Sequence, residues 1–130
     1  MRYSFENLEV WQMSRELVND IYKSTSTFLR DEKFGLTSQL RRASVSVSSN
    51  IAEGSTGWSK KDQSGFYEIA YCNLTEVLNQ LIPSTDLDFL QETQLTKLRT
   101  KIDQKRRMLN SLNKSTHQPI NPSTHKPINQ

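Results

Sequence analysis

The stretch FGLTSQLRRASVSVSSNIAEG, residues 34–54, constrains the fold of this chain more than any other. Its second face carries small hydroxyl side chains where a surface helix ordinarily carries Lys and Glu. Small side chains allow another backbone to come close, so the pattern predicts a helix with two contact faces. Gly54 is expected to take the left-handed turn that often ends a helix. The apolar residues of this stretch recur at steps of three and four, as on one helix face: Leu36, Leu40, Ala43, Val47, Ile51 and Gly54.

Three further segments are predicted to be helices, because their apolar residues follow the same period. They cover residues 5–28, 60–82 and 93–113. Ser59 and Asp62 match a capping box, and Pro83 is expected to end the third of the four helices at Ile82 or to kink it there. The links are short, as between antiparallel neighbours. We therefore predict an all-α fold, an antiparallel up-down-up-down four-helix bundle over residues 1–114.

Two polar positions interrupt the predicted core. Lys105 occupies a heptad seam position of the last helix. Its stem is expected to lie along the seam with the ammonium group in water. Cys72, the single cysteine of the chain, is expected to be a buried structural thiol. The other core positions are apolar and include Val10, Leu17, Ile21, Phe28, Phe66, Ala70, Val77, Leu81, Leu95, Leu98, Ile102, Leu109 and Leu112.

The composition changes abruptly after Lys114. Residues 115–130 repeat one eight-residue unit, STHxPINx, with three prolines and few apolar groups. Such a segment cannot repay the entropy of ordering, so we predict a disordered tail. No apolar run is long enough to span a bilayer, the N-terminus lacks a secretory signal, and one cysteine excludes an internal disulfide framework. We expect a cytoplasmic protein that does not contact the membrane.

Catalytic and metal-binding motifs are missing from the sequence. His117 and His125, the only histidines, lie in the repeated tail and cannot form a preorganised site. The chain has no glycine-rich phosphate loop and no E-x-x-H pair of the kind that di-iron bundles use. We therefore predict no catalytic residues, no cofactor and no metal site, and hence no enzyme activity.

Basic residues are unevenly distributed along the chain. The last predicted helix is basic, whereas residues 62–92 contain acidic residues and no Lys or Arg. A basic stripe would bind nucleic-acid phosphates in a salt-dependent manner. The alternatives are that the third and fourth helices offset each other's charge, or that the basic helix is only solvated. The candidate nucleic-acid-binding residues are Arg41, Lys60, Lys61, Lys97, Arg99, Lys101, Arg106 and Arg107.

The small-residue face of residues 34–54 is the candidate oligomer interface. Glu53 would lie in the last turn of its helix, where the macrodipole disfavours a negative charge, so it needs a cationic partner. Arg42 lies about 16 Å away along the same helix, too far for a pair within one chain. The partner is therefore Arg42 of another subunit or, alternatively, Arg15 of the same one. The candidate interface residues are Gln39, Arg42, Ser46, Ser49, Asn50 and Glu53.

Several motifs in this chain match those of a known family. They are FxxLxVWQ at residues 5–12, FGLTxQLRRA at 34–43, SxNIAEG at 48–54, and SxxD at 59–62. With these motifs, residues 3–112 resemble the bacterial four-helix-bundle proteins known as 23S rRNA-intervening-sequence proteins. The resemblance implies assembly into a homopentamer. It also implies similarity to the accessory variability protein of diversity-generating retroelements, a pentamer that binds nucleic acid and a reverse transcriptase.

Composition, motifs and resemblance together favour one function. We expect a non-enzymatic, homo-oligomeric scaffold or adaptor, pentameric by resemblance, that binds RNA or DNA and interacts with a protein partner. The alternative is a purely structural or protein-partner module with no nucleic-acid role. Affinity for RNA that falls steeply with added salt would separate the two.

Overall fold

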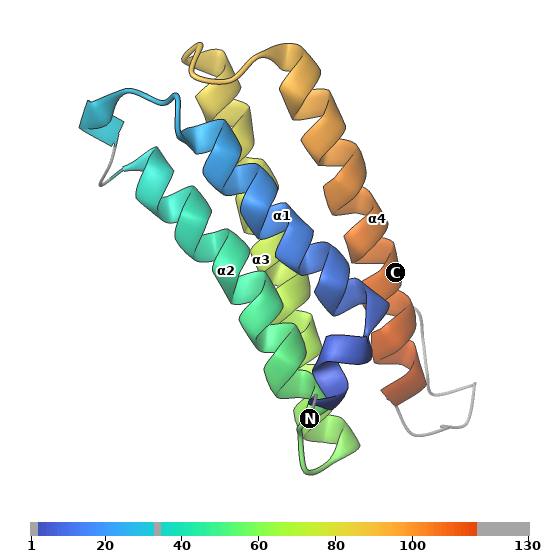
Figure 1. The fold of residues 1–130 in the computed structure, drawn as a ribbon. Coiled ribbons are helices and arrows are strands. Elements are labelled where there is room, and N and C mark those ends of the chain that lie inside the picture. The colour runs from blue at the N-terminus through green and yellow to red at the C-terminus, as the bar shows by residue number, and fades with distance from the viewer. Residues whose placement is uncertain (1–2, 33–34, 117–130) are drawn as a thin grey trace.

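The computed structural model describes residues 3–32 and 35–116. In these ranges its regular secondary structure consists of α-helices and short 3-10 helices only. The helices run alternately up and down, so the predicted all-α four-helix bundle is confirmed (Figure 1). The elements are η1 (Ser4–Asn7), α1 (Glu9–Thr25), η2 (Arg30–Glu32), α2 (Leu36–Ser55), α3 (Lys60–Asp86) and α4 (Glu92–Thr116).

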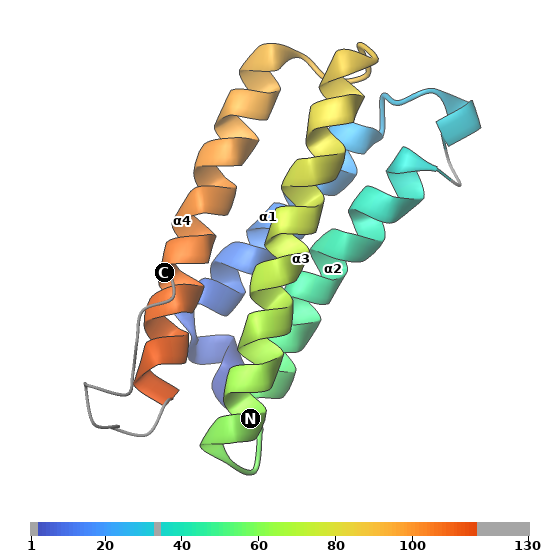
Figure 2. The same ribbon diagram turned by 180° about the vertical axis from the view of Figure 1, so that it is seen from behind.

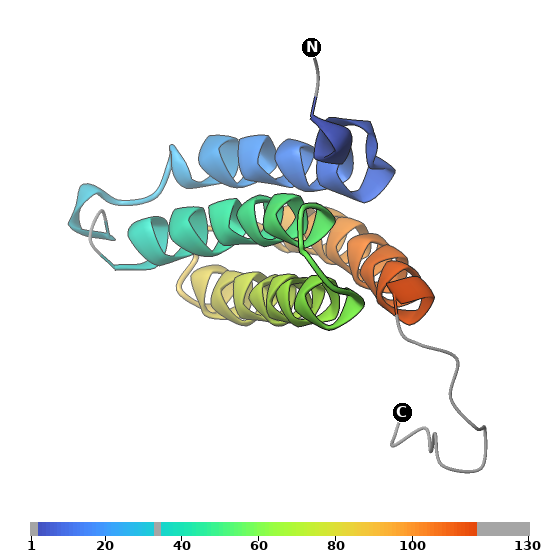
Figure 3. The ribbon, with the colours of Figure 1, turned by 90° about the horizontal axis from the view of Figure 1, so that it is seen from below.

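The four helices are not packed equally. α2 packs against α1 on one side and α3 on the other, α3 packs against α4, and α1 and α4 touch only sparsely (Figures 1 and 3). One core runs through the bundle, and the apolar periodicity of the sequence predicted most of it. Its members include Val10, Leu17, Ile21, Leu40, Val47, Ile51, Ala70, Leu74, Val77, Leu81, Leu98, Ile102 and Leu109.

Gly54 has a different role from the predicted one. It lies inside α2 rather than after it, and no glycine in the chain has a positive φ. A Cβ atom at this position would overlap the ring of Tyr67 on α3. The glycine therefore permits close packing of α2 on α3, and the expected left-handed turn is wrong.

The predicted ends of two helices are also corrected. α1 begins at Glu9, not near Phe5, because Leu8 is extended (φ −75°, ψ 125°). α3 continues past Pro83 to Asp86. The two residues after the proline are buried, and their hydroxyl groups bond to carbonyl oxygens of the preceding turn. Ser84 Oγ donates to the carbonyl of Gln80 (2.8 Å) and Thr85 Oγ1 to that of Leu81 (3.0 Å). These bonds support the turn that the proline weakens.

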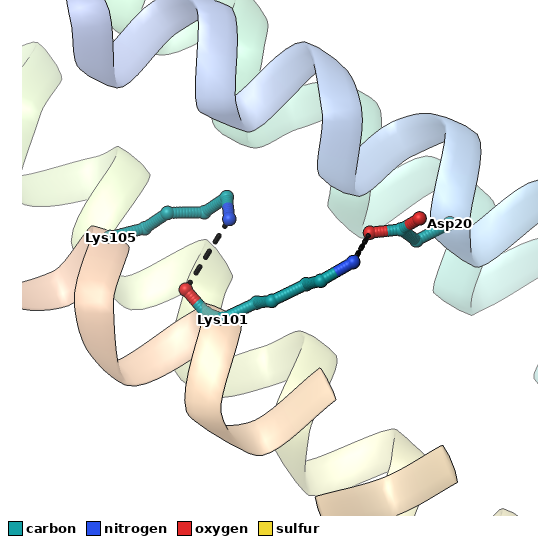
Figure 4. A network of polar contacts seen from close by, with 3 residues as sticks. All are labelled: Asp20, Lys101 and Lys105. Carbon is teal, nitrogen blue, oxygen red and sulfur yellow. Dashed lines mark hydrogen bonds and ion pairs between the residues drawn. The ribbon is translucent and has the colours of Figure 1, made fainter. Parts of the chain in front are cut away.

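Lys105 and Cys72 are both placed differently from expectation. Lys105 is only 2% exposed, and its ammonium group donates to the carbonyl oxygen of Lys101 (3.3 Å) instead of reaching water (Figure 4). Cys72 is exposed on α3, so it is not a core thiol.

α4 ends at Thr116, slightly beyond the predicted boundary at Lys114, and the rest of the predicted tail lies outside the described residues.

Candidate functional site

The predicted interface residues lie along one outer side of α2, where it borders α3. A shallow cavity of about 400 Å³ between the two helices is lined by three of them, Gln39, Arg42 and Ser46, together with Ser38, Ala43 and Glu76. Ser49, Asn50 and Glu53 continue the same side by helical spacing. Of the six predicted residues, Ser46 and Asn50 are half-buried and the others are exposed. We call this side, together with the facing residues of α3, the α2–α3 face.

The α3 side of this face contains polar groups with incomplete hydrogen bonding. Gln80 Nε2 donates to Gln39 Oε1 (3.3 Å) and Glu76 Oε2 (3.4 Å), both long contacts. Within the described residues, Gln80 Oε1 and Asn73 Nδ2 are buried without a hydrogen-bond partner. Ile69 lies on the same row of α3 and is 50% exposed. A buried polar atom without a hydrogen-bond partner lowers the free energy of unfolding, so nearly all such atoms in folded proteins have a partner. Two exceptions near one exposed face are therefore unusual.

Two charges on the α2–α3 face have no ionic partner in the described part of the chain. Arg42 and Glu53 are both exposed, and neither forms a salt bridge there. Arg15, the alternative partner for Glu53, lies over the ring of Trp11 instead, 5.8 Å from its centroid. The predicted pair between Arg15 and Glu53 is therefore not formed.

Arg41, one of the predicted nucleic-acid-binding residues, ties α2 to the end of α1. Its Nε donates to Thr25 Oγ1 (2.9 Å) and one terminal nitrogen to the carbonyl of Tyr22 (3.4 Å). The guanidinium lies 4.4 Å from the centroid of the Tyr22 ring. A cation at the C-terminal end of α1 also complements the helix dipole. Arg41 thus has a structural role.

Two further predicted residues, Lys101 and Arg106, are also bound within the subunit. Lys101 Nζ pairs with Asp20 Oδ2 of α1 at 2.8 Å (Figure 4). Arg106 donates to the hydroxyl of Tyr71 on α3 (3.0 Å) and stacks over its ring, 4.8 Å from the centroid. Arg106 also lies 3.7 Å from Asp103. Among the described residues, no ion pair joins the acidic helix α3 to the basic helix α4. The predicted compensation of charge between these helices therefore does not occur through direct pairs.

The remaining predicted cations, Lys60, Lys61, Lys97, Arg99 and Arg107, are exposed. They do not form a single stripe. Lys97 and Arg99 lie in the first half of α4, at the same end as the C-terminus of α3. Lys60 and Lys61 lie in the first turn of α3, which faces the last turns of α4 (Figure 2). Arg107 lies on α4 near Tyr71, about midway along the bundle between these two groups.

Sequence reasoning missed the groove between α3 and α4. A cavity of about 280 Å³ is lined by Tyr67, Glu68, Tyr71, Cys72, Leu109, Asn110 and Asn113, and a smaller one of about 140 Å³ by Tyr71, Asp103, Arg106, Arg107 and Asn110. Tyr71 and Asn110 line both, so the two cavities are neighbours along the pair of helices. We call them the α3–α4 groove. The helical spacing of Tyr67 and Tyr71 was the available signal, but it is equally typical of a core.

In the described ranges, the two titratable groups with altered pKa values, Tyr67 and Lys105, face the inside of the bundle. Burial lowers the pKa of the Lys105 ammonium, the nearby Lys101 charge lowers it further, and the carboxylates of Asp20 and Glu16 partly oppose this. Burial raises the pKa of the Tyr67 hydroxyl. Both changes follow mainly from packing. Among the described residues, no three His, Cys, Asp or Glu side chains gather closely enough to hold a metal ion.

Comparison with known proteins identifies the family. A family model described as 23S rRNA-intervening sequence protein matches residues 6–111. A crystal structure of a protein of unknown function from the S23 ribosomal protein family of Bacteroides thetaiotaomicron is similar in fold, with a TM-score of 0.75. The two sequences are 21% identical, and the similarity covers 81% of this chain and 95% of that one. No curated protein matches this chain. None of the described helices is long and apolar enough to cross a membrane.

Proposed function

This chain belongs to the 23S rRNA-intervening sequence protein family, and we propose that it acts as a non-enzymatic, homo-oligomeric scaffold that binds RNA or DNA. The proposed assembly is the homopentameric ring implied by the sequence resemblance, and the proposed location is the cytoplasm. Adaptor contacts to a protein partner belong to the same proposal. The similarity to the accessory variability protein stays a prediction.

The α2–α3 face carries this proposal. It combines small side chains on α2 with two opposite charges and two buried polar atoms, and neither the charges nor the atoms have a partner among residues 3–32 and 35–116. A second copy of the chain could supply ionic partners for the exposed Arg42 and Glu53. In a cyclic ring each contact joins two different patches, so Arg42 of one subunit can meet Glu53 of the next. The neighbouring bundle must be inclined to α2, because the two residues lie about 16 Å apart along the helix.

The non-enzymatic part of the proposal is supported by the roles of the inner polar groups. Lys101 pairs with Asp20, Lys105 bonds to a backbone carbonyl, and Arg106 holds Tyr71. Lys101 and Arg106 thus join α4 to α1 and α3, and the Lys105 bond lies within α4. The nucleic-acid part is supported by the exposed cations Lys60, Lys61 and Arg107, which have no ion pair within the described residues.

Light scattering coupled to size exclusion tests the assembly. The full chain should have a mass about five times its 15.1 kDa. Arg42→Glu and Glu53→Arg should each lower that mass, because each places like charges across the proposed contact. The double reversal, Arg42→Glu with Glu53→Arg, should restore it. Arg99→Glu is a matched control, since it reverses an exposed cation on α4, away from the α2–α3 face.

A monomeric wild-type chain would overturn the ring. Single reversals that leave both helicity and mass unchanged would show that the ring does not use the Arg42–Glu53 contact. A monomer whose α2–α3 face binds another protein would favour the alternative function, a protein-partner module.

A further inference from the structure

Trp58 is the most exposed large apolar side chain in the described part of the chain. It lies between α2 and α3 and is 99% exposed. Tryptophan is highly buried on average, because its ring loses favourable free energy when it stays in water. Ser59, the next residue, caps α3 by accepting from the backbone N–H of Asp62 (3.0 Å). The cap fixes the start of α3 and so holds the loop at the end of the bundle.

Two cations, Lys60 and Lys61, follow Trp58 after Ser59, and helical spacing places them on the groove side of α3. Lys60 and Lys61 precede Tyr67 and Glu68 by two helical turns, so each lies on the same side of α3 as a residue that lines the groove. Asp62 instead shares a row with Ile69, which places its carboxylate on the side toward the α2–α3 face. The two lysines therefore lie beyond one end of the groove, and the exposed Trp58 lies in the loop that leads into the same turn of α3.

The opposite wall of the groove is also basic. The hydrogen bond between Arg106 and Tyr71 fixes an antiparallel register, so the last turns of α4 lie beside the first turns of α3 (Figure 2). Lys114 follows Arg107 by two turns and lies on the same row. Arg106 and Arg107 line the groove together with the carboxylates Glu68 and Asp103. By helical spacing, Lys60, Lys61 and Lys114 lie on the same rows beyond its end.

We propose that the α3–α4 groove binds single-stranded nucleic acid, with the phosphates along Lys60, Lys61, Arg107 and Lys114 and a base stacked on Trp58. An exposed indole can stack on any base whose face is free, and a duplex does not offer such a face along its length. The cations supply the salt-dependent part of the affinity. This inference deepens the nucleic-acid part of the proposed function and does not require the ring. In a ring, cyclic symmetry would place every Trp58 at one end of the assembly, which would raise the avidity for a long strand.

Trp58 fluorescence in a Trp11→Phe background provides a direct test, because Trp58 is then the only tryptophan. The full chain is titrated with a 20-nucleotide uridine strand and with the corresponding duplex. The single strand should quench Trp58 emission on binding, and the duplex should bind more weakly. In the wild-type background, Trp58→Ala should weaken single-strand binding about tenfold or more, and Trp58→Phe should recover part of the loss.

A matched pair of double variants locates the phosphate contacts. Replacing Lys60 and Lys61 by Ala should lower both the affinity and the slope of its salt dependence, by about two phosphate contacts. Replacing Lys97 and Arg99 by Ala removes the same charge from the other half of α4 and should change the affinity less than about twofold. Equal losses from both pairs would show attraction by net charge alone and would overturn the inference.

Light scattering on the same samples separates this inference from the proposed ring. A ring that does not bind the strand, or that binds it without quenching Trp58, overturns the groove and leaves the assembly standing. A monomer that binds with quenching supports the groove and overturns the ring. A lower mass for Trp58→Ala would identify Trp58 as a contact between copies, which also overturns the inference.

Discussion

α2 and α4 both pack on α3, and in the described part of the chain their backbones do not come close to each other. α2 approaches α3 closely through small residues, and at Gly54 there is no room even for a Cβ atom beside Tyr67. α4 meets α3 through long side chains, with Arg106 reaching across to Tyr71 and cavities on either side. α2 and α3 are therefore closely packed, whereas the outer surfaces of α3 and α4 are separated by a groove.

This difference shows that the size of the side chains at a helix contact determines the shape of the surface beside it, and hence the kind of partner that surface suits. Close packing makes α2 and α3 one rigid ridge, and its outer side is suited to another helix of similar shape. The wider spacing of α3 and α4 leaves a groove bordered by cations, which is suited to an extended anionic strand. α4 also carries Lys105 on its inner side, where it faces α1. The following predictions test this contrast between α2 and α4.

The largest expected effect is at the contact of α2 with α3. Gly54→Ala should lower the free energy of unfolding by about 1–3 kcal/mol, because the new methyl group overpacks against the Tyr67 ring. Urea unfolding followed by circular dichroism measures the change. Gly65→Ala is the matched control. Gly65 lies in α3 with nothing within 4 Å of an added Cβ, so this change should stabilise the protein by about 0.5–1 kcal/mol. Equal effects at both glycines would show that α2 and α3 are not closely packed.

The next effect concerns the buried cation on α4. Lys105→Met should raise the free energy of unfolding near neutral pH by about 1–2 kcal/mol, because it replaces a buried charge that lacks a carboxylate partner. The advantage has a defined pH dependence. The pKa of Lys105 is lower in the folded than in the unfolded protein, so between these two values the unfolded chain binds more protons and the wild type gains stability as pH rises.

The stability difference between Lys105→Met and wild type should therefore be full below the folded pKa of Lys105 and should shrink as pH rises toward the unfolded value near 10.5. Urea unfolding of both proteins across that alkaline range measures it. Subtracting one curve from the other cancels the titration of the groups they share. A difference that stays constant with pH would show that Lys105 is not buried as a charge.

The smallest effect is expected at the sparse contact of α4 with α1. Lys101 and Asp20 form a salt bridge of 2.8 Å, but their side chains are 49% and 26% exposed, so solvent screens the pair. A double-mutant cycle with Lys101→Ala and Asp20→Ala should give a coupling free energy of at most about 1 kcal/mol, falling with added salt. A larger, salt-independent coupling would mean that α1 and α4 are joined more firmly than the geometry indicates.

The fold was predictable because its determinants are local and repeated. Apolar residues at helical spacing gave the four helices and most of the core, and Ser59 was correctly predicted to cap the start of α3 by accepting from the Asp62 amide. The candidate interface residues were predicted to share one side of α2, and they do. The cation set was predicted as one stripe, but Arg41, Lys101 and Arg106 are bound within the subunit. Helical spacing specifies a direction around one helix and says nothing of which neighbour lies there.

The sequence by itself determined that this chain forms four amphipathic helices, since the period of its apolar residues permits no other regular structure to bury them. Only the tertiary structure decided what three particular residues do. Gly54 accommodates Tyr67, Lys105 is enclosed between α4 and α1, and Trp58 remains in water. The first two outcomes depend on the distance between two helices, and the third on whether any element covers the loop; all are set by side chains far apart in the sequence.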